Sequence, residues 1–351
     1  MTRPENRIPL FTRLLTAEAT GADAAPFAEV LGRAREAEAA GIDALLLHDR
    51  QSAAPAPADA PHFESGTLTA ALAVATRGIG LVTTVCTEQA LPYHAARALA
   101  TADHLSHGRS GWQPDTRADP AAAGNYTRAG SASAAERRAR AEEFTQVLTG
   151  LWDSFDDDAF VRDRASAAYF VPEKLHPLDH RGDHFDVAGP LNIARPPQGH
   201  PPLVHRVADA DDIAFAARVA DVVLAPADSA PALRDTVREL ARRAGRPDPP
   251  VVLLDRPVDS APGAAAELRA LVDSGVADGF TLLAPPGPAG AAHHAVLALT
   301  AELRAAEPPT APPATLRARL GLRRPPGRYR SAPATTPDDY AHSMPEGGSR
   351  G

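Results

Sequence analysis

The sequence predicts a single α/β domain folded as a (β/α)₈ barrel. Short apolar runs rich in β-branched residues alternate strictly with amphipathic helical patterns, and each kind of segment occurs eight times. The apolar runs lack the polar alternation of half-exposed strands, as expected for strands buried on both faces of a parallel sheet. An open doubly wound sheet is the usual competitor of a closed barrel for such a pattern.

The eight predicted strands follow one another at fairly regular intervals. They cover residues 8–14, 42–47, 79–85, 108–112, 202–207, 221–226, 250–255 and 279–284. The fourth run is the weakest of them, because Gly108 and Gly111 dilute it.

The eight predicted helices lie between these runs. They cover residues 25–40, 66–77, 93–106, 136–153, 209–219, 229–244, 262–274 and 290–306. In the fourth helix Phe144, Val147 and Leu148 fall on one apolar stripe with charges opposite. Ser229 is the predicted N-cap of the sixth helix, and Gly245 is its predicted C-terminal stop.

Two segments fall outside the alternation. Residues 154–200, rich in Pro, Asp and His, are predicted to form a long insertion after the fourth helix. Residues 331–351 are polar and rich in Pro, Gly and Ser, and we expect them to form a disordered tail. The barrel is therefore predicted to span residues 1–330.

Composition and charge narrow the class of protein. Hydrophobic residues make up 44% and charged residues 23%, as in an average globular protein. The net charge is −8 and no basic stripe follows a predicted helix, which argues against nucleic acid as the main partner. A single cysteine, no signal-peptide layout and no apolar run of about 20 residues predict a cytoplasmic protein without a membrane span.

Barrel enzymes of this kind place their chemistry at the C-terminal ends of the strands. The residues expected there are His48, Asp49, Thr84, Cys86, Thr87, Trp112 to Thr116, His205, Arg206, Asp228, Asp255, Arg256, Pro285 and Pro286. They include no glycosidase-like carboxylate pair, no GxSxG elbow and no P-loop. The residues alone therefore predict a barrel enzyme or a binding protein without choosing between the two.

The histidines and the cysteine favour no metal site and no nucleophile. His176, His180 and His184 are spaced four apart, but Pro177 and Gly182 break any helix that would align them. Cys86 is expected to be a buried small residue, since no neighbouring base is evident.

Several stretches resemble a known family. Residues 67–112, 136–199, 271–286 and 320–329 are similar to the nitrilotriacetate and dibenzothiophene-sulfone monooxygenase branch of the bacterial luciferase-like flavin-dependent monooxygenases. The block 144–199 is specific to this branch. Compared with typical members, the segment 255–262, before the last helix–strand unit, is shortened.

The resemblance implies a two-component mechanism. A separate reductase supplies reduced FMN, which reacts with oxygen in the barrel mouth to give a C4a-(hydro)peroxyflavin that oxidises a small organic substrate. The flavin carries the chemistry, while the protein orients it and excludes water. The resemblance also implies a homodimer or heterodimer, and a substrate from secondary metabolism or desulfurisation-like chemistry.

The resemblance also suggests which residues lie near the flavin. Asp49 follows the second strand as in the family, Thr84 and Thr87 match threonines at the end of the third, and Cys86 replaces a usual Ser. The predicted cofactor-binding residues are Asp49, Thr84, Thr87, Trp112, Thr116 and Arg206. No catalytic residue and no metal ligand is predicted.

Both segments that hold the flavin phosphate in the family differ here. The family's H-D-x-R-Y is replaced by residues 134–138, Ala-Ala-Glu-Arg-Arg, so its His and Tyr are absent. The family's A-G-x-S-x-x-G, whose amides bind phosphate at a helix N-terminus, is replaced by residues 206–212. Their three carboxylates complement the helix dipole and would repel a phosphate dianion. Compensation would have to come from four nearby cations, His205, Arg206, Arg137 and Arg138.

Three functions therefore stay open. The first is a reduced-FMN-dependent monooxygenase. The second is a flavin-free homologue that acts as a partner subunit or a small-molecule binding protein. The third is a repurposed barrel enzyme that works without flavin.

Overall fold

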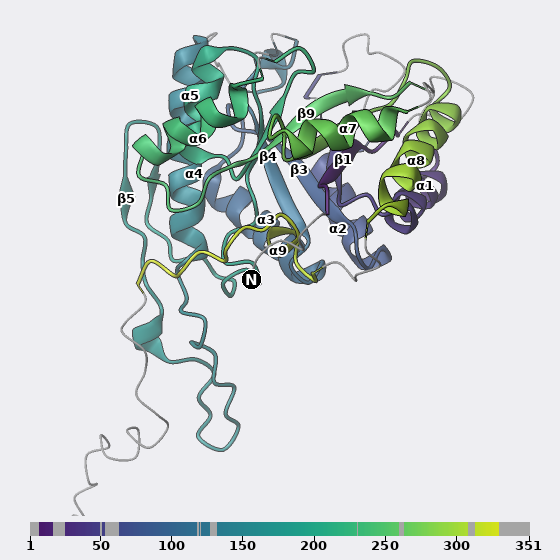
Figure 1. Ribbon diagram of the computed structural model, residues 1–351. Coiled ribbons are helices and arrows are strands. Elements are labelled where there is room, and N and C mark those ends of the chain that lie inside the picture. Colours follow the sequence, from purple (N-terminus) through teal and green to yellow (C-terminus); the bar gives the residue numbers. More distant parts are fainter. Residues whose placement is uncertain are drawn as a thin grey trace, which may run out of the picture.

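The computed structural model is an eight-stranded parallel sheet rolled into a nearly closed barrel and wrapped by helices (Figure 1). The structure describes residues 7–16, 25–49, 51–52, 63–117, 119, 121–126, 132–229, 231–259, 263–307 and 313–329. In these ranges no helix is both long and apolar enough to cross a membrane. The tail predicted at 331–351 lies outside the described residues.

All eight predicted strands are present. They are β1 (Leu10–Arg13), β2 (Ala44–Leu47), β3 (Gly80–Cys86), β4 (Ser110–Asp115), β7 (Val204–Arg206), β8 (Val222–Ala225), β9 (Val251–Pro257) and β10 (Gly279–Leu283). Their order in the sheet is β4-β3-β2-β1-β10-β9-β8-β7, and every pair is parallel. Between the two end strands, β4 and β7, the amide of Trp112 donates to the carbonyl of Pro202 at 3.0 Å. The predicted barrel is therefore confirmed, with a narrow seam between β4 and β7.

All eight predicted helices are also present. They are α1 (Phe27–Ala40), α2 (Ser65–Ala75), α3 (Pro92–Leu105), α4 (Ala134–Trp152), α5 (Ala210–Val219), α6 (Leu233–Arg243), α7 (Ala264–Asp273) and α8 (Ala289–Ala305). The N-cap prediction for α6 is wrong, because the Ser229 amide closes a turn onto Pro226 and Ala232 caps the helix. Gly245 follows the end of α6 with φ +75°, as a C-terminal stop does.

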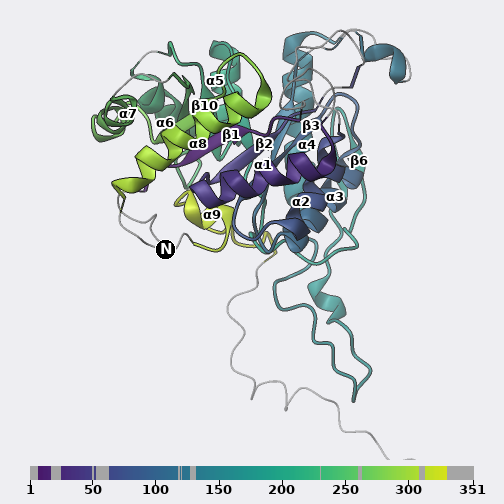
Figure 2. The same ribbon diagram turned by 90° about the vertical axis from the view of Figure 1, so that its right-hand side faces the viewer.

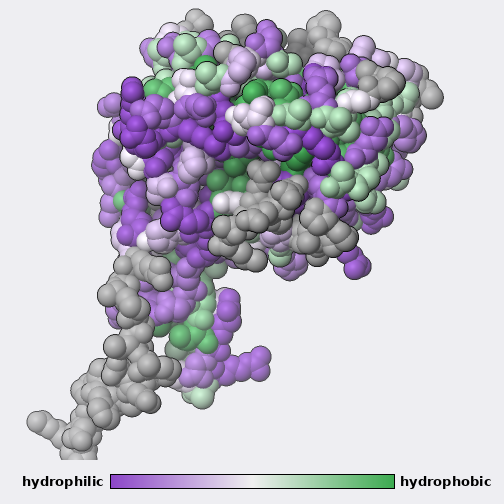
Figure 3. All heavy atoms as spheres, in the orientation of Figure 1, coloured by the Kyte–Doolittle hydropathy of each residue, from purple (hydrophilic) through white to green (hydrophobic). Residues whose placement is uncertain are grey.

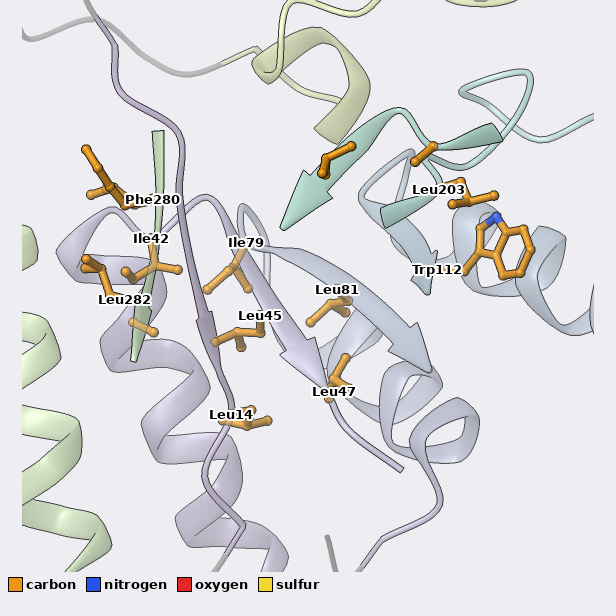
Figure 4. Close-up of a cluster of buried hydrophobic side chains, with 14 of the residues drawn as sticks. Leu14, Ile42, Leu45, Leu47, Ile79, Leu81, Trp112, Leu203, Phe280 and Leu282 are labelled. Carbon is orange, nitrogen blue, oxygen red and sulfur yellow. The ribbon is translucent and has the colours of Figure 1, made fainter. Parts of the chain in front are cut away.

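The strands bury side chains on both faces, so the core has two layers. Leu45, Leu47 and Leu81 lie in the layer between the sheet and the helices (Figure 4). Phe11 and Val82 belong to the cluster inside the barrel. Because side chains alternate along a strand, this division determines which residues face the barrel axis.

A short C-terminal helix, α9 (Leu316–Arg319), belongs to the inner cluster and covers the N-terminal end of the barrel (Figure 2). The amide of Leu316 donates to the carbonyl of Gly108 at 2.9 Å. A Cβ on Gly80 would lie 2.9 Å from Leu316 Cδ1, so glycine at this position lets the leucine enter. The sequence patterns do not predict this floor. It leaves the opposite end of the barrel, where the strands finish, as the mouth.

The predicted insertion lies between α4 and β7. It includes the hairpin β5 (His180–Arg181) and β6 (Asp186–Val187) and the 3₁₀ turn η2 (Pro172–Lys174). Part of it projects from the end of the barrel that α9 covers (Figures 1 and 2). Phe155 packs against Phe160 and Phe170 at ring separations of 4.7 and 5.8 Å, which gives this projection its own apolar cluster (Figure 3).

Asp103, on the inner side of α3, joins the insertion to the barrel. Its carboxylate accepts hydrogen bonds from the amide of Gln198 at 3.2 Å and from Gln198 Nε2 at 2.6 Å. Burial raises the pKa of Asp103 from 3.8 to about 6, against the lowering effect of these bonds.

This buried carboxyl group predicts a pH-dependent stability. Its pKa is higher in the folded than in the unfolded state, so the folded state favours the protonated carboxyl group. The contribution of this group to the free energy of unfolding is therefore complete below pH 4 and is lost as the pH rises through 6. A rise of about two units corresponds to about 3 kcal/mol over this range. Urea unfolding between pH 4 and 7 is expected to show this loss in the native chain, and a flatter profile in Asp103→Asn. Equal slopes in the two proteins would contradict the assignment.

Candidate functional site at the barrel mouth

On several strands, an apolar residue of the inner cluster is followed two positions later by a polar residue. Alternation places these side chains on the axis at or just beyond the strand ends. They are Arg13, His48, Thr84, Arg206 and Asp255. The mouth is therefore charged, whereas the barrel below it is apolar.

An ion pair crosses this mouth. Arg206 of β7 is bonded to Asp255 of β9, although β8 lies between the two strands. Asp255 is 8% exposed, and its burial raises the pKa, against the lowering effect of Arg206 and Arg13. Among the described residues, Asp255 Oδ1 and the buried hydroxyl of Thr281, its register partner on β10, have no hydrogen-bond partner. The barrel just below the mouth thus holds a buried carboxylate oxygen and a buried hydroxyl whose hydrogen-bonding capacity is not used.

A cavity of about 350 Å³ opens beside the ends of β2 and β3. Asp49, Thr84, Cys86 and Tyr126 are among the residues that line it. Ser65 Oγ connects two of them, since it lies 3.2 Å from Asp49 Oδ2 and 2.8 Å from the carbonyl oxygen of Thr84. The structure therefore brings Asp49 and Thr84 together, and their contact with a flavin stays a prediction.

The other predicted residues lie apart from this cavity. Thr87 Oγ1 is 3.4 Å from the carbonyl oxygen of Asp115, and the carbonyl of Thr116 accepts from Arg137 Nε at 2.8 Å. Trp112 points away from the barrel axis and packs beside Leu203 at the seam (Figure 4). Its ring centroid is 6.5 Å from that of Trp152. The structure does not bring Trp112 together with Asp49.

A larger cavity, of about 570 Å³, lies at the seam between β4 and β7. It adjoins the start of β7 and the floor of the barrel, so it is distant from the strand ends. The arginines in its wall are used by the fold: Arg218 pairs with Glu142 at 2.8 Å, and Arg317 pairs with Asp221 at 2.8 Å. Size alone does not make this cavity the candidate site.

Cys86, the sole cysteine, is expected to react slowly with thiol reagents. Burial and the nearby Asp115 raise its pKa, so the reactive thiolate is scarce at neutral pH. We predict alkylation by iodoacetamide at pH 7.5 to be several-fold slower than that of free cysteine, with a rate profile shifted to higher pH. Intact-mass spectrometry over time measures this rate, and labelling as fast as the free amino acid would refute the assignment.

The histidines of the insertion are held separately. His176 Nε2 lies 3.2 Å from Asp156 Oδ1, and the imidazole stacks on Tyr329. His180 Nε2 lies 3.0 Å from Glu143 Oε1. Throughout the described ranges, no group of three or more His, Cys, Asp or Glu side chains is placed to hold a metal ion.

Carboxylates at the start of α5 accept hydrogen bonds from backbone amides nearby. Asp209 is the N-cap, and its Oδ1 accepts from the amide of Asp212 at 2.8 Å. Asp212 Oδ2 in turn accepts from the amide of Ala208 at 3.1 Å. His205, the Ala208 amide and Arg138 hold the pKa of Asp212 below its ordinary value, so this carboxylate is charged at neutral pH.

Arg138 reaches this turn from α4. Its guanidinium lies 2.9 Å from Asp211, 3.5 Å from Asp212 and 3.9 Å from Asp209. One cation therefore faces three carboxylates.

Two of the other three cations that could have compensated for these carboxylates are engaged elsewhere. Arg137 donates to the carbonyls of Thr116 and Ala132, and Arg206 pairs with Asp255. The third, His205, is buried with its ring edge against Phe215, at a centroid separation of 4.8 Å, and its Nε2 lies 3.9 Å from Asp212 Oδ1, so it faces the carboxylates of the turn as Arg138 does. The residues at this turn therefore do not fit a phosphate dianion.

The sequence profile of the luciferase-like monooxygenases matches residues 8–340. The chain belongs to this family. This membership agrees with the resemblance found in the sequence.

The relatives of this family member include a synthase subunit and several monooxygenases. It is 42% identical over 313 residues to one of the subunits of pristinamycin IIA synthase from Streptomyces pristinaespiralis, a match that covers 88% of this chain and 94% of that protein. It is 47% identical over 161 residues to the nitrilotriacetate monooxygenase of Aminobacter aminovorans, which covers 46% of this chain and 36% of that protein. The chain thus matches nearly all of the first relative and about a third of the second.

Solved structures agree on the fold. EDTA monooxygenase from Chelativorans sp. BNC1 superimposes with a TM-score of 0.79 at 25% sequence identity, over 91% of this chain and 99% of that chain. Long-chain alkane monooxygenase superimposes with a TM-score of 0.77 at 20% identity, over 91% of this chain and 96% of that chain.

Proposed function

We propose that this chain is one subunit of a reduced-FMN-dependent, two-component monooxygenase that oxidises a small organic substrate. One observation carries the proposal: the match to the pristinamycin IIA synthase subunit extends over 94% of that protein. The other subunit of the same synthase is also similar to this chain, at 35% identity over 195 residues. A synthase with two related subunits supports a second luciferase-like chain as the partner here, together with a flavin reductase.

In such an enzyme the flavin supplies the oxygen-activating chemistry. The contribution of this chain to the reaction follows from its own residues. The apolar interior and the floor formed by α9 keep water out of the barrel from below. At the mouth, the partly exposed guanidinium of Arg206, held in place by Asp255, offers a donor that can orient the polar end of a substrate.

A second candidate is a monooxygenase that works without a related partner. The cavity beside β2 and β3 supports it, because Asp49 and Thr84, two residues that the resemblance suggests lie near the flavin, line this cavity. A flavin-free binding protein is the third outcome of the same experiment.

The test is purification of the chain, tagged and expressed at natural level, from its own host. We expect a second luciferase-like chain in a stoichiometric complex. That complex, given NADH, FMN and a flavin reductase, should oxygenate a substrate that the isolated chain does not oxygenate. Substrate oxygenation by the isolated chain would instead establish the second candidate. Isolation without a related chain, combined with no oxygenation, would reject both.

A further inference from the structure

We propose that the first turn of α5 carries a built-in anion, formed by Asp209 and Asp212 and neutralised in part by Arg138. In the family the amides of this turn bind the flavin phosphate. Here the chain's own carboxylates occupy it, so a ligand of this barrel binds without placing a phosphate group at α5. This property of the turn goes beyond the proposed function, since it holds whether or not a second chain is present.

Two hydrogen bonds link the carboxylates of this turn to nearby backbone amides. The N-cap carboxylate of Asp209 holds the amide of Asp212, and the carboxylate of Asp212 reaches back to the amide of Ala208. Each of the two side chains therefore covers an amide that would otherwise be available to an anion. The pattern is related to the capping box of α4, where Ser133 and Glu136 exchange such bonds.

The changes in two distant segments match each other. Arg138 stands where the family has the Tyr of H-D-x-R-Y, and Asp209 and Asp212 stand where it has the Ser and the last Gly of A-G-x-S-x-x-G. The structure joins these segments through the contacts of Arg138 with Asp211 at 2.9 Å and with Asp212 at 3.5 Å. A cation gained on α4 and carboxylates gained on α5 make a rebuilt site with internal partners.

The remaining charge excludes a phosphate dianion. Three carboxylates face one guanidinium and the imidazole of His205, so at most two positive charges oppose three negative ones and the turn keeps a net negative charge. The helix dipole is already complemented by these acids, which removes the usual attraction of a helix N-terminus for an anion. The rest of an oxidised flavin, which is uncharged apart from its phosphate, meets no such repulsion.

The first experiment compares FMN with riboflavin on the purified full chain, by quenching of flavin fluorescence. The two ligands differ only in the phosphate. We expect dissociation constants within about threefold of each other, or no binding of either ligand. A tenfold or greater preference of the native chain for FMN would overturn the proposal.

The second experiment opens the turn with Asp209→Ser combined with Asp212→Gly. Serine keeps an N-cap and the two changes restore the family pattern, so the variant is expected to fold. We expect it to prefer FMN over riboflavin at least tenfold. Inorganic phosphate, compared with chloride of equal ionic strength, should also raise its melting temperature by more than the general stabilising effect of phosphate that the native chain shows. The melting experiment decides the matter if neither flavin binds.

Asp211→Asn is the matched control. Asp211 contacts Arg138 in the same turn, but no hydrogen bond from its side chain to an amide of the turn is seen. Its replacement removes one charge and leaves both amides covered, so the preference for FMN should stay below threefold. If Asp209→Ser with Asp212→Gly folds but gains neither a preference for FMN nor stabilisation by phosphate, the proposal is wrong. Asp212→Ser alone, which uncovers only the Ala208 amide, provides a milder variant should the double one unfold.

Discussion

Replacement of Asp43 by alanine is expected to lower the free energy of unfolding by about 3–5 kcal/mol, the usual cost of removing one partner of a buried ion pair. Asp43 precedes β2 and is 2% exposed. Its carboxylate lies 2.9 Å from Arg7 and 2.7 Å from Arg304, and it accepts a hydrogen bond from the amide of Leu10 at 2.9 Å. It therefore connects the start of β1 to α8, and its loss leaves the Leu10 amide without its acceptor and two largely buried guanidinium groups with Glu307 as their remaining carboxylate.

Equilibrium unfolding in urea, followed by circular dichroism, measures this effect. Glu239→Ala is the control, because Glu239 pairs with Arg242 and Arg243 on the surface of α6. Exposed pairs of this kind contribute about 0–1 kcal/mol. A loss below about 1 kcal/mol in Asp43→Ala would contradict its placement in a buried network.

Leu316→Ala is expected to destabilise the protein by about 3–5 kcal/mol, as large-to-small changes in a well-packed core do. Leu316 is fully buried in the inner cluster, where it approaches Gly80 and Gly111 at the base of the barrel. A cavity there would weaken the contact between the C-terminal segment and the strands. The same change should speed proteolysis of the C-terminal segment.

Val74→Ala is the matched control for this prediction. Val74 on α2 is 69% exposed, so truncating its side chain removes little buried surface. We expect a change within about 0.5 kcal/mol. Similar losses in the two variants, measured by urea unfolding, would show that α9 does not pack as the floor of the barrel.

The strands could be predicted because the side chains on both faces of each strand are apolar. Each strand therefore appears in the sequence as a continuous apolar run. The exception is instructive. The fourth run was predicted to end at Trp112, whereas β4 continues to Asp115. Gln113 and Asp115 are polar because they approach the mouth, so the functional end of a strand breaks the apolar run that identifies it. Sequence patterns therefore mark the core part of each strand better than its site-forming end.

The floor and the ion pair of the mouth could not be predicted in this way. Leu316 enters the barrel because Gly80 leaves room for it, and nothing in the long stretch of sequence between them records that contact. Arg206 and Asp255 come from strands that are not neighbours in the sheet. Contacts of this kind depend on the closure of the barrel and leave no local signal.

The α5 turn could be predicted from the sequence only in part. The sequence showed three carboxylates where the family binds a phosphate, and it offered several cations as possible compensation. Only the structure shows that Arg137 is used by backbone carbonyls and Arg138 by the carboxylates themselves. Whether a charge is available to a ligand depends on its partners in the fold.

A crystal structure of the native chain grown in phosphate with FMN added would test the central claim most directly. We predict that the Asp212 carboxylate stays within hydrogen-bond distance of the Ala208 amide, with Arg138 beside it and no phosphate group at the turn. A phosphate group bound to the amides of this turn, with Asp209 and Asp212 rotated away, would contradict the account.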